Sequence, residues 1–596
     1  MRSLILSFFL LSTLFLAPLS VQAQEPEAPP PADAAEGAEA VAEEAGTQEA
    51  QGEDTEADDS EAEDAEPADL FGDSIQVNVV NVDVYVTDKK GNPILGLTED
   101  DFEIFEDGRP MEISNFYPVE NGRPVGEDGV VVQEEVVPGL PQHLQPVEVP
   151  EDQRLHLVVF IDHFNIRPFN RNRVMRELRQ FLTTKLRPED RVMLVSYTRS
   201  LKIEHPFTSD PRVISGLMTT LEKKTGSATL ADSERKQVLE DIDDSDSEWN
   251  ALARARLYAE SLTNDMTFTI NALKDFVDSL AGLPGRKAIL HVSDGLPMVP
   301  GEDVFHYIDN KFKRTVALTE AFTYDLSRRF DQLAAQANAN RVTFYMIDAG
   351  GLRTYSHIDA SNRGGPGRGP FIDTINISNL QNSLHYLSNV TGGTAIVNRN
   401  RVLPALEEVS NDLRNYYSLG YTPPHAGDGR LYKLKVKVDI KGAQVRHRES
   451  YRDKSVETTM AETTMASLHF DYHDNPLDVK LDFGDPVKRP RDNLYTVPVR
   501  VRIPLSKVTL VPRESTHEGR LRVWLSALDD KGRTAPVQEA PVPISIPNDE
   551  IDRAREQYYV YTIELLMRSG GQDVAVGLRD DLGADTSFVS RRINVG

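Results

Sequence analysis

Three short apolar runs in the chain each end on a carboxylate. Residues 155–162 read LHLVVFID, residues 287–294 read KAILHVSD and residues 341–348 read RVTFYMID. Each run is too short for a buried helix and is rich in branched and aromatic residues, which favours a strand covered on both faces. Helical patterns separate the three runs. The sequence therefore predicts an open α/β sheet whose ligand crevice lies outside the carboxyl ends of the strands.

The stretches around these runs complete the predicted α/β domain. Further strands are expected at residues 191–197, 201–205 and 394–397, and helices at 171–186, 211–223, 267–280, 311–340, 378–389 and 402–414. Residues 224–265 are acidic and only partly helical in pattern, which indicates an insertion on the surface of this domain.

Period-two alternation marks the segments on either side of the α/β domain. Residues 75–117 predict about four strands and residues 416–451 predict three. Small sheets of this size are marginal alone, so we expect the two segments to join into one Ig-like β-sandwich with the α/β domain inserted between them. Residues 468–596 alternate again and predict a separate β-sandwich.

The pattern divides the chain into consecutive regions. These are a signal peptide (1–23), a disordered acidic linker (24–73), an N-terminal β segment (74–118), a linker (119–153), the α/β domain (154–414), strands completing the first sandwich (415–452), a second linker (453–467) and the C-terminal sandwich (468–596).

The N-terminus predicts export. Arg2 precedes a long apolar run that ends at a small-x-small site, which predicts signal-peptide cleavage after Ala23; an uncleaved membrane anchor is the alternative. Residues 24–72 hold 18 of the 94 acidic residues and no Lys or Arg, a composition typical of disorder. Later segments fall short of the about 18 apolar residues of a membrane span. We expect an exported soluble protein, periplasmic or extracellular.

Composition excludes several kinds of chemistry. The chain has no cysteine, which rules out disulfides, thiol nucleophiles and thiolate metal sites. Its formal net charge is −29, and it shows no basic stripe with interleaved aromatic residues, so nucleic-acid binding is not expected. The glycine, serine and histidine motifs of common hydrolases and nucleotide-binding enzymes are also missing from the sequence. The protein is therefore predicted not to be an enzyme.

Four segments together suggest a family. GLPGRKAILHVSDG, RVMLVSY, RVTFYMIDAGGL and YLSNVTGGTAIV resemble segments of the von Willebrand factor A domain, in particular an exported bacterial subgroup. The resemblance covers about residues 74–452 of the printed sequence. It implies a six-stranded, mostly parallel Rossmann-like sheet between helices. It also implies a ligand site at the top of the sheet, where many members hold a divalent cation for adhesion.

The resemblance places a metal-ion-dependent adhesion site on three residues. Asp162, Thr267 and Asp294 match the family's ligands and would hold Mg²⁺ or Mn²⁺ through oxygen atoms. The positions of the family's two serine ligands hold Phe164 and Ile166, which have no ligating atom, so the site is degenerate.

Other roles remain open for the same residues. His163 and Asn165 are the polar neighbours that could join a binding surface. Asp162 and Asp294 could instead cap a helix N-terminus or accept loop N–H groups, and Thr267 could be a helix N-cap.

Three functions are compatible with these residues. The first is a non-enzymatic exported protein that binds a protein or cell-surface partner through the top face, with Asp162, His163, Asn165, Thr267 and Asp294 as candidate residues. The second is an exported hydrolase that uses a metal-bound water in the same crevice. The third is a structural envelope scaffold in which the C-terminal sandwich carries assembly.

Overall fold

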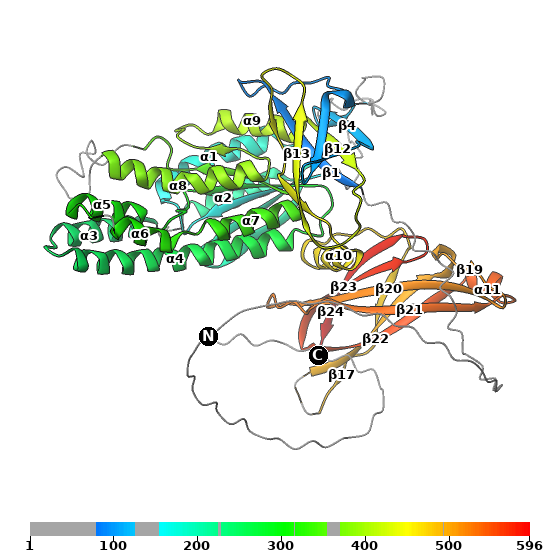
Figure 1. The fold of residues 1–596 in the computed structure, drawn as a ribbon. Helices are drawn as coiled ribbons and strands as arrows, with labels where there is room; N and C mark the ends of the chain where they lie inside the picture. Colours follow the sequence, from blue (N-terminus) through cyan, green and yellow to red (C-terminus); the bar gives the residue numbers. More distant parts are fainter. Residues whose placement is uncertain are drawn as a thin grey trace, which may run out of the picture. The chain divides into compact units, whose positions relative to one another are not determined.

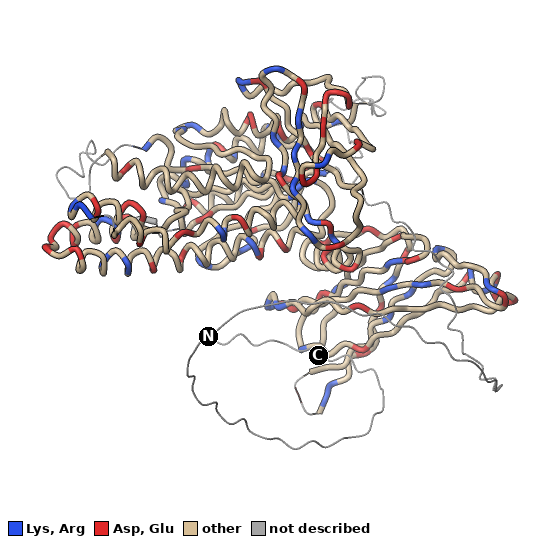
Figure 2. Tube along the Cα trace, viewed as in Figure 1, with Lys and Arg blue, Asp and Glu red and all other residues tan. Residues whose placement is uncertain are grey.

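A computed structural model describes residues 79–125, 154–224, 228–314, 316–353, 370–490, 492 and 494–596. The predicted signal peptide and acidic linker lie outside these residues, as do most of the first linker and segment 354–369. Among the described helices, none is both long enough and apolar enough to cross a bilayer. Figure 2 shows basic and acidic residues interspersed along the described chain.

The predicted α/β sheet is present and has six strands. Its order is β11-β10-β9-β6-β7-β8, the arrangement of doubly wound folds, and only the β7–β8 pair is antiparallel. The strands are β6 (Leu155–Asp162), β7 (Arg191–Tyr197), β8 (Leu201–Thr208), β9 (Arg286–Ser293), β10 (Val342–Asp348) and β11 (Ala395–Ile396). The order reverses between β6 and β9, the place where such sheets bind ligands.

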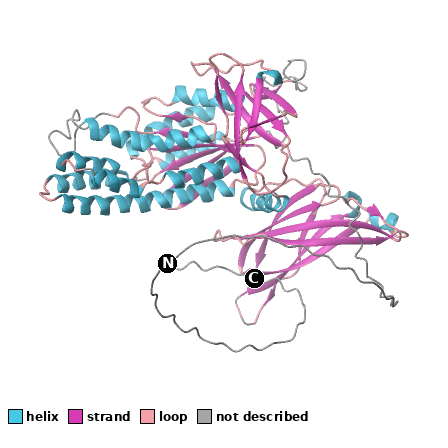
Figure 3. Cartoon of the chain, viewed as in Figure 1, coloured by secondary structure: helices cyan, strands magenta, loops and turns pink. Residues whose placement is uncertain are grey.

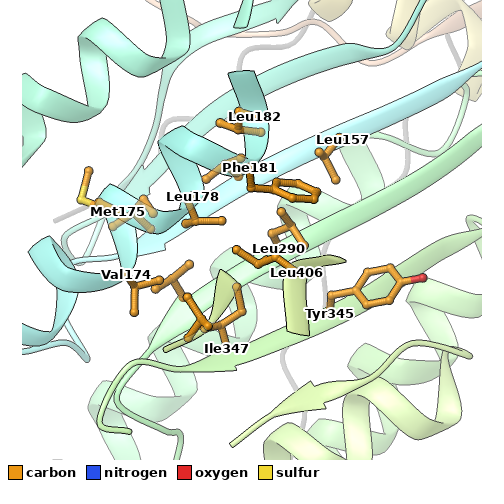
Figure 4. Close-up of a cluster of buried hydrophobic side chains, with 14 of the residues drawn as sticks. Leu157, Val174, Met175, Leu178, Phe181, Leu182, Leu290, Tyr345, Ile347 and Leu406 are labelled. Atoms are coloured by element: carbon orange, nitrogen blue, oxygen red, sulfur yellow. The ribbon is translucent and has the colours of Figure 1, made fainter. Parts of the chain in front are cut away.

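Helices cover both faces of this sheet (Figures 1 and 3). Alternate residues of β6 enter two different cores: Leu157 packs with the side of α1 and α9, and Phe160 packs with the side of α4 and α7. Figure 4 shows the first of these cores. The helices are α1 (Pro168–Lys185), α2 (Pro211–Leu221), α3 (Ala228–Asp243), α4 (Glu248–Ser279), α5 (Glu302–Phe312), α6 (Val316–Ala321), α7 (Ser327–Ala339), α8 (Pro370–Val390) and α9 (Leu403–Arg414).

The predicted surface insertion at residues 224–265 is a packed helical unit. It consists of α3 and the first half of α4, a single helix of 32 residues that continues into the domain core. Ala251 and Ala255 of α4 pack with Val304 and Phe305 of α5 in a separate hydrophobic core. The expectation of a helix starting at Thr267 is therefore wrong, because apolar burial continues the helix back to Glu248.

The two segments that flank the α/β domain form one structure. Strands from both segments pair in two sheets, β14-β1-β12-β4-β5 and β15-β13-β2-β3, which share a hydrophobic core. The N-terminal strands are β1 (Val80–Thr87), β2 (Phe102–Glu106), β3 (Arg109–Met111), β4 (Asn115–Glu120) and β5 (Arg123–Pro124). The later strands are β12 (Tyr416–Tyr421), β13 (Leu431–Val438), β14 (Gln444–Arg446) and β15 (Ser450–Arg452). Immunoglobulin-like topology stays a prediction.

A buried arginine joins this pair of sheets to the α/β domain. Arg286, the first residue of β9, is 7% exposed, and its guanidinium donates to the Tyr85 hydroxyl (2.8 Å) and the Leu413 carbonyl (3.0 Å). The same group lies 3.4 Å from an Asp83 carboxylate oxygen and over the Tyr416 ring, with its carbon 3.7 Å from the ring centre. The Arg286 guanidinium is thus bound by residues of the α/β domain and of the flanking sheets.

Residues 453–467, predicted to be a linker, are mostly a helix. Helix α10 (Val456–Phe470) is capped by Ser455, and its Met460 packs against Trp524 and Phe588. Two antiparallel sheets with a common core follow, as the alternating pattern of residues 468–596 predicts. Their strands are β16 (Lys480–Phe483), β17 (Val487–Lys488), β18 (Leu494–Pro504), β19 (Val511–Pro512), β20 (Thr516–Asp529), β21 (Gln538–Pro547), β22 (Tyr558–Arg568), β23 (Gly570–Asp580) and β24 (Thr586–Val595), with the short helix α11 (Ile551–Arg555).

Replacing the buried arginine tests this junction. We expect Arg286→Met to lower the free energy of unfolding by about 3 kcal/mol, because Asp83 and the two other partners lose their donor in a buried setting. Denaturant unfolding of the full chain measures this loss. Arg500→Met, at an exposed position of β18, is the control and should change stability by less than about 0.5 kcal/mol. Equal effects of the two substitutions would contradict the role of Arg286.

Buried histidines predict acid sensitivity. Burial lowers the pKa of His156 from 6.5 to about 3 and that of His163 to about 4. Since each folded-state pKa lies below 6.5, the stability that depends on the neutral ring is present above pH 6.5 and is lost as the pH falls towards these values. Each group contributes a slope of up to about 1.4 kcal/mol per pH unit.

Replacing His156 measures its contribution to the pH dependence of the unfolding free energy. His156→Leu should make the fall in unfolding free energy between pH 6.5 and 4 shallower. His473→Leu, which removes an exposed ring, is the control for the loss of a histidine at the surface. Chemical denaturation at a series of pH values gives both slopes, and a His156→Leu slope equal to that of the wild type would contradict the prediction.

Candidate functional site

Three aspartates lie at the carboxyl ends of neighbouring strands in the α/β sheet. Asp162 ends β6, Asp294 follows β9 and Asp348 ends β10, and their exposures are 0%, 7% and 1%. Because parallel strands end at the same edge, the three carboxylates meet where the strand order reverses. Their hydrogen-bond partners decide what this edge can bind.

Asp162 is satisfied by the turn that follows it. Its Oδ1 accepts the backbone N–H groups of Phe164 (3.1 Å) and Asn165 (2.9 Å), and its Oδ2 accepts the Asn165 side-chain amide (2.8 Å). Burial raises the pKa of Asp162 to about 6 despite these bonds. The aspartate thus acts as the acceptor that shapes the turn, one of the two roles open to it from sequence.

Asp294 is satisfied by the start of α1. Its Oδ2 accepts the Arg167 backbone N–H (3.0 Å) and lies 3.3 Å from the Arg167 guanidinium, while the Asn170 amide donates to both oxygens (3.0 and 2.9 Å). Burial raises the pKa of Asp294, and the Arg167 charge opposes that rise. This is the helix N-terminal position that favours a carboxylate.

Arg167 also fastens the helical insertion to the sheet edge. Its Nε and Nη2 donate to the two carboxylate oxygens of Asp232 in α3, both at 2.6 Å. The same guanidinium therefore bridges Asp294 and Asp232, with side-chain exposures of 39% for Arg167 and 48% for Asp232. The positive charge next to Asp294 at this edge is therefore supplied by Arg167 of the protein itself.

Asp348 has a comparable set of donors. Its Oδ1 accepts Arg353 Nη2 (2.9 Å) and the Gly350 N–H (2.8 Å), and its Oδ2 accepts the Gln381 amide of α8 (2.7 Å). Arg353 donates as well to the Asp294 carbonyl. The second arginine therefore ties the ends of β9 and β10 together.

The other predicted site residues occupy different places. His163 is fully buried, with its Nδ1 3.0 Å from the Arg171 guanidinium, so it faces the interior and not the edge that holds the three aspartates. Thr267 lies within α4, and it is Thr269 whose hydroxyl is close to the site, 3.4 Å from the Asn165 amide nitrogen. A helix turns by about 100° per residue, so a shift of two positions moves a side chain to another face.

The two positions without ligating atoms belong to the core. Ile166 is fully buried and packs with the α1 side of the sheet. Phe164 makes an edge contact with Tyr197, and the Arg199 guanidinium lies 4.8 Å from its ring centre. Apolar packing has replaced the hydroxyl groups that a cation would need here.

These residues do not fit a divalent cation. A Mg²⁺ or Mn²⁺ ion needs oxygen atoms turned towards it, but both oxygens of Asp162 and of Asp294 already accept protein N–H groups. The donors include the Arg167 guanidinium, which would repel a metal ion at this place. The cluster is neutralised by arginine and amide groups of the chain itself.

Sequence reasoning missed most of these donors. Arg167 and Asn170 lie in a stretch rich in Arg and Asn at the start of α1, a pattern that could have pointed to internal partners for the acids. Arg353 and Gln381 follow Asp348 by 5 and 33 residues, and the Gln381 contact depends on the path of α8. Segment 354–369, which directly follows Arg353, lies outside the described residues.

Comparisons with known proteins add little. No family model matches the chain, and no curated protein matches it. Similar solved structures include an aerotolerance-related membrane protein from Bacteroides fragilis NCTC 9343 with multiple mutations to serines (11% identity, 44% of this chain and 98% of that one, TM-score 0.23). Others are a conserved hypothetical protein BatB from Bacteroides thetaiotaomicron (11%, 44% and 97%, 0.21) and the human COPII-coat protein Sec24c (10%, 53% and 46%, 0.22). Similarity this low supports no inference about function.

The donor arrangement predicts a metal-independent edge. Thermal unfolding of the metal-free protein should not change on adding Mg²⁺, whereas an ion bound at 100 times its dissociation constant would add about 2.7 kcal/mol. Asp294→Ala should lose about 2 kcal/mol, because the Arg167 N–H and the Asn170 amide lose their buried acceptor, and the loss should be the same with and without Mg²⁺. A Mg²⁺-dependent stabilisation that disappears in Asp294→Ala would contradict this assignment.

Proposed function

We propose that the chain is an exported, non-enzymatic protein of the von Willebrand factor A type that binds a protein partner through the carboxyl edge of its α/β sheet. The four sequence segments that resemble that family support the type, and the doubly wound strand order agrees with it. Export follows from the signal-like N-terminus. In this proposal the partner is held by apolar and polar side chains of the edge, without a metal ion.

Exposed apolar side chains at this edge carry the proposal. Phe169 at the start of α1 is 78% exposed, Leu352 after β10 is 62% exposed and Phe371 at the start of α8 is 61% exposed. Phe169 is next to Asn170, which donates to Asp294, and Leu352 is next to Arg353, which donates to Asp348. Phe371 lies ten residues before Gln381 in α8, and its ring contacts His306 of α5. Aromatic side chains on a rigid base are the usual anchors of protein interfaces.

The edge also has the rigidity that a binding surface needs. Arg173 of α1 donates to the Ala349 carbonyl (2.5 Å), and Asn400 accepts the Leu352 N–H through its side-chain oxygen (3.0 Å). Leu352 is therefore held by bonds on both sides of the loop. Little ordering is left to oppose association, which favours affinity.

A metal-assisted hydrolase draws less support from the same edge. Such an enzyme needs a cation that lowers the pKa of a bound water. The carboxylates that would hold this cation accept N–H groups of Asn165, Arg167 and Asn170 instead. Binding is the function that the observed contacts favour.

Site-specific photocrosslinking tests the proposal. A photoreactive amino acid at position 169 or 371, in full-length protein produced by a bacterial host that exports it, should yield the same crosslinked protein species. The same amino acid at position 560, where Val560 of β22 is 49% exposed, is the matched control and should not yield that species.

Substitution then distinguishes binding from mere proximity. Phe169→Asp and Phe371→Asp should each weaken capture of the crosslinked partner by at least about tenfold, equivalent to about 1.4 kcal/mol, with unchanged thermal unfolding. Val560→Asp should leave capture unchanged. Capture that survives both edge substitutions, or a crosslink that forms equally from position 560, would contradict the proposal.

A further inference from the structure

A second polar cluster lies in the sheets that flank the α/β domain, on other elements than Asp162, Asp294 and Asp348. It gathers His425 and Asp428 from the turn between β12 and β13, and Asp453 just after β15. Backbone bonds fix this geometry: the Gly429 N–H donates to the Asp453 carbonyl (2.7 Å), and the Asp453 N–H donates to the Arg430 carbonyl (3.0 Å). Figure 1 labels β12 and β13.

The three side chains bring possible ligand atoms together. One imidazole nitrogen and one carboxylate oxygen from each aspartate lie within 4.8 Å of one another. His425 Nδ1 is 2.8 Å from Asp453 Oδ2. In a tetrahedral zinc site with bonds of about 2.0–2.2 Å, ligand atoms lie about 3.3 Å apart, so small movements suffice. Asp428 has 29% of its side chain exposed and is the ligand with room to move.

The far side of the imidazole has the support typical of a metal-binding histidine. His425 Nε2 is 3.0 Å from Glu106 Oε1, a buried carboxylate at the end of β2. The Tyr421 and Tyr451 hydroxyls both donate to Glu106 Oε2, at 2.5 and 2.7 Å. A carboxylate that accepts the other ring N–H fixes the tautomer of a histidine ligand and raises its basicity.

Stacking holds the ring at the angle that these bonds require. The Tyr432 ring lies parallel to His425, with 3.8 Å between ring centres and 8° between planes. The Tyr432 hydroxyl also donates to Asp428 Oδ2 (2.5 Å). One tyrosine thus positions two of the three ligands: its ring stacks on His425, and its hydroxyl donates to Asp428.

Carboxylates outnumber the basic groups of this cluster. Asp428 Oδ1 accepts the Arg430 N–H (2.9 Å) and its Oδ2 lies 3.8 Å from Arg430 Nε, but the Arg430 side chain is 80% exposed, so its charge is screened by solvent. Glu106, Asp428 and Asp453 bring three carboxylates around a single imidazole, and the Asp453 side chain has 0% exposure. Several buried carboxylates need positive charge or N–H donors to offset desolvation. A divalent ion in place of the proton on His425 Nδ1 would supply that charge.

We propose that His425, Asp428 and Asp453 form a binding site for a divalent transition-metal ion, zinc in the first instance, with Glu106 as the supporting carboxylate. Nitrogen and oxygen ligands from three residues match a zinc site that keeps an open coordination position for water or a further ligand. Since Glu106 belongs to the N-terminal strands and the three ligands to the later ones, the ion would fasten the two segments to each other.

Zinc titration of the full chain tests the site. Metal-free protein is titrated with Zn²⁺ against a chelating dye and, separately, with Co²⁺ while its visible absorption is recorded. We expect one Zn²⁺ ion to bind per chain. Bound Co²⁺ should show the visible absorption of a four-coordinate ion. Asp428→Asn changes an exposed ligand and should weaken binding at least about tenfold without loss of folding, and His425→Gln should abolish it.

A second histidine–aspartate pair gives the matched control. His473 Nε2 lies 2.9 Å from Asp471 Oδ1 in an exposed setting, so His473→Gln reports adventitious binding by such a pair. Zinc binding that persists in His473→Gln and falls in Asp428→Asn supports the site. Binding that falls in His473→Gln instead, or wild-type protein that takes up no zinc, overturns the proposal and leaves His425 as a metal-free link between carboxylates. These outcomes are independent of partner capture at the α/β edge.

Discussion

Burial of the central sheet on both faces is the constraint that the rest of the structure depends on. Strands β6 and β9 have no exposed residue along their length, and apart from His291 their polar side chains lie near the strand ends. At the start of β9, Arg286 is shared by Asp83, Tyr85 and the Leu413 carbonyl, which connects the sheet to the flanking strands. At the other end, buried aspartates have to find donors within the chain.

Those donors come from the protein chain itself. In the family that the sequence resembles, hydroxyl side chains and an ion satisfy the acids at this edge. Here Ile166 is buried in one core of the domain and Phe164 packs, partly buried, against the other, and the positive charge comes from Arg167 and Arg353. A guanidinium offers a planar set of donors but no open coordination position. In the proposed function, this network of ion pairs and hydrogen bonds would be the base on which partner-binding side chains are mounted.

The flanking sheets depend on long-range pairing, because they are assembled from two segments that the α/β domain separates in the sequence. Pairing of β1 with β12 and of β2 with β13 closes this long loop in the chain. Such long-range pairing has an entropic cost that local contacts do not repay. The aromatic and acidic cluster around His425 lies where Glu106 meets the later strands. A metal ion there would reinforce the junction between the two segments.

The printed sequence by itself determined the strands and the class of the main domain, because local periodicity reports which faces of a segment are buried. It also predicted that residues 74–118 and 415–452 belong together, since neither could form a stable sheet alone. Tertiary structure decided what local pattern cannot encode. The Met, Thr and Ala residues of α10 show little periodicity and so predict a linker, whereas packing against Trp524 makes this segment a helix. Thr269 lies near the site in place of Thr267 because α4 begins far upstream. The donors to Asp294 and the neighbours of His425 come from distant parts of the chain, and only the fold brings them within hydrogen-bond distance.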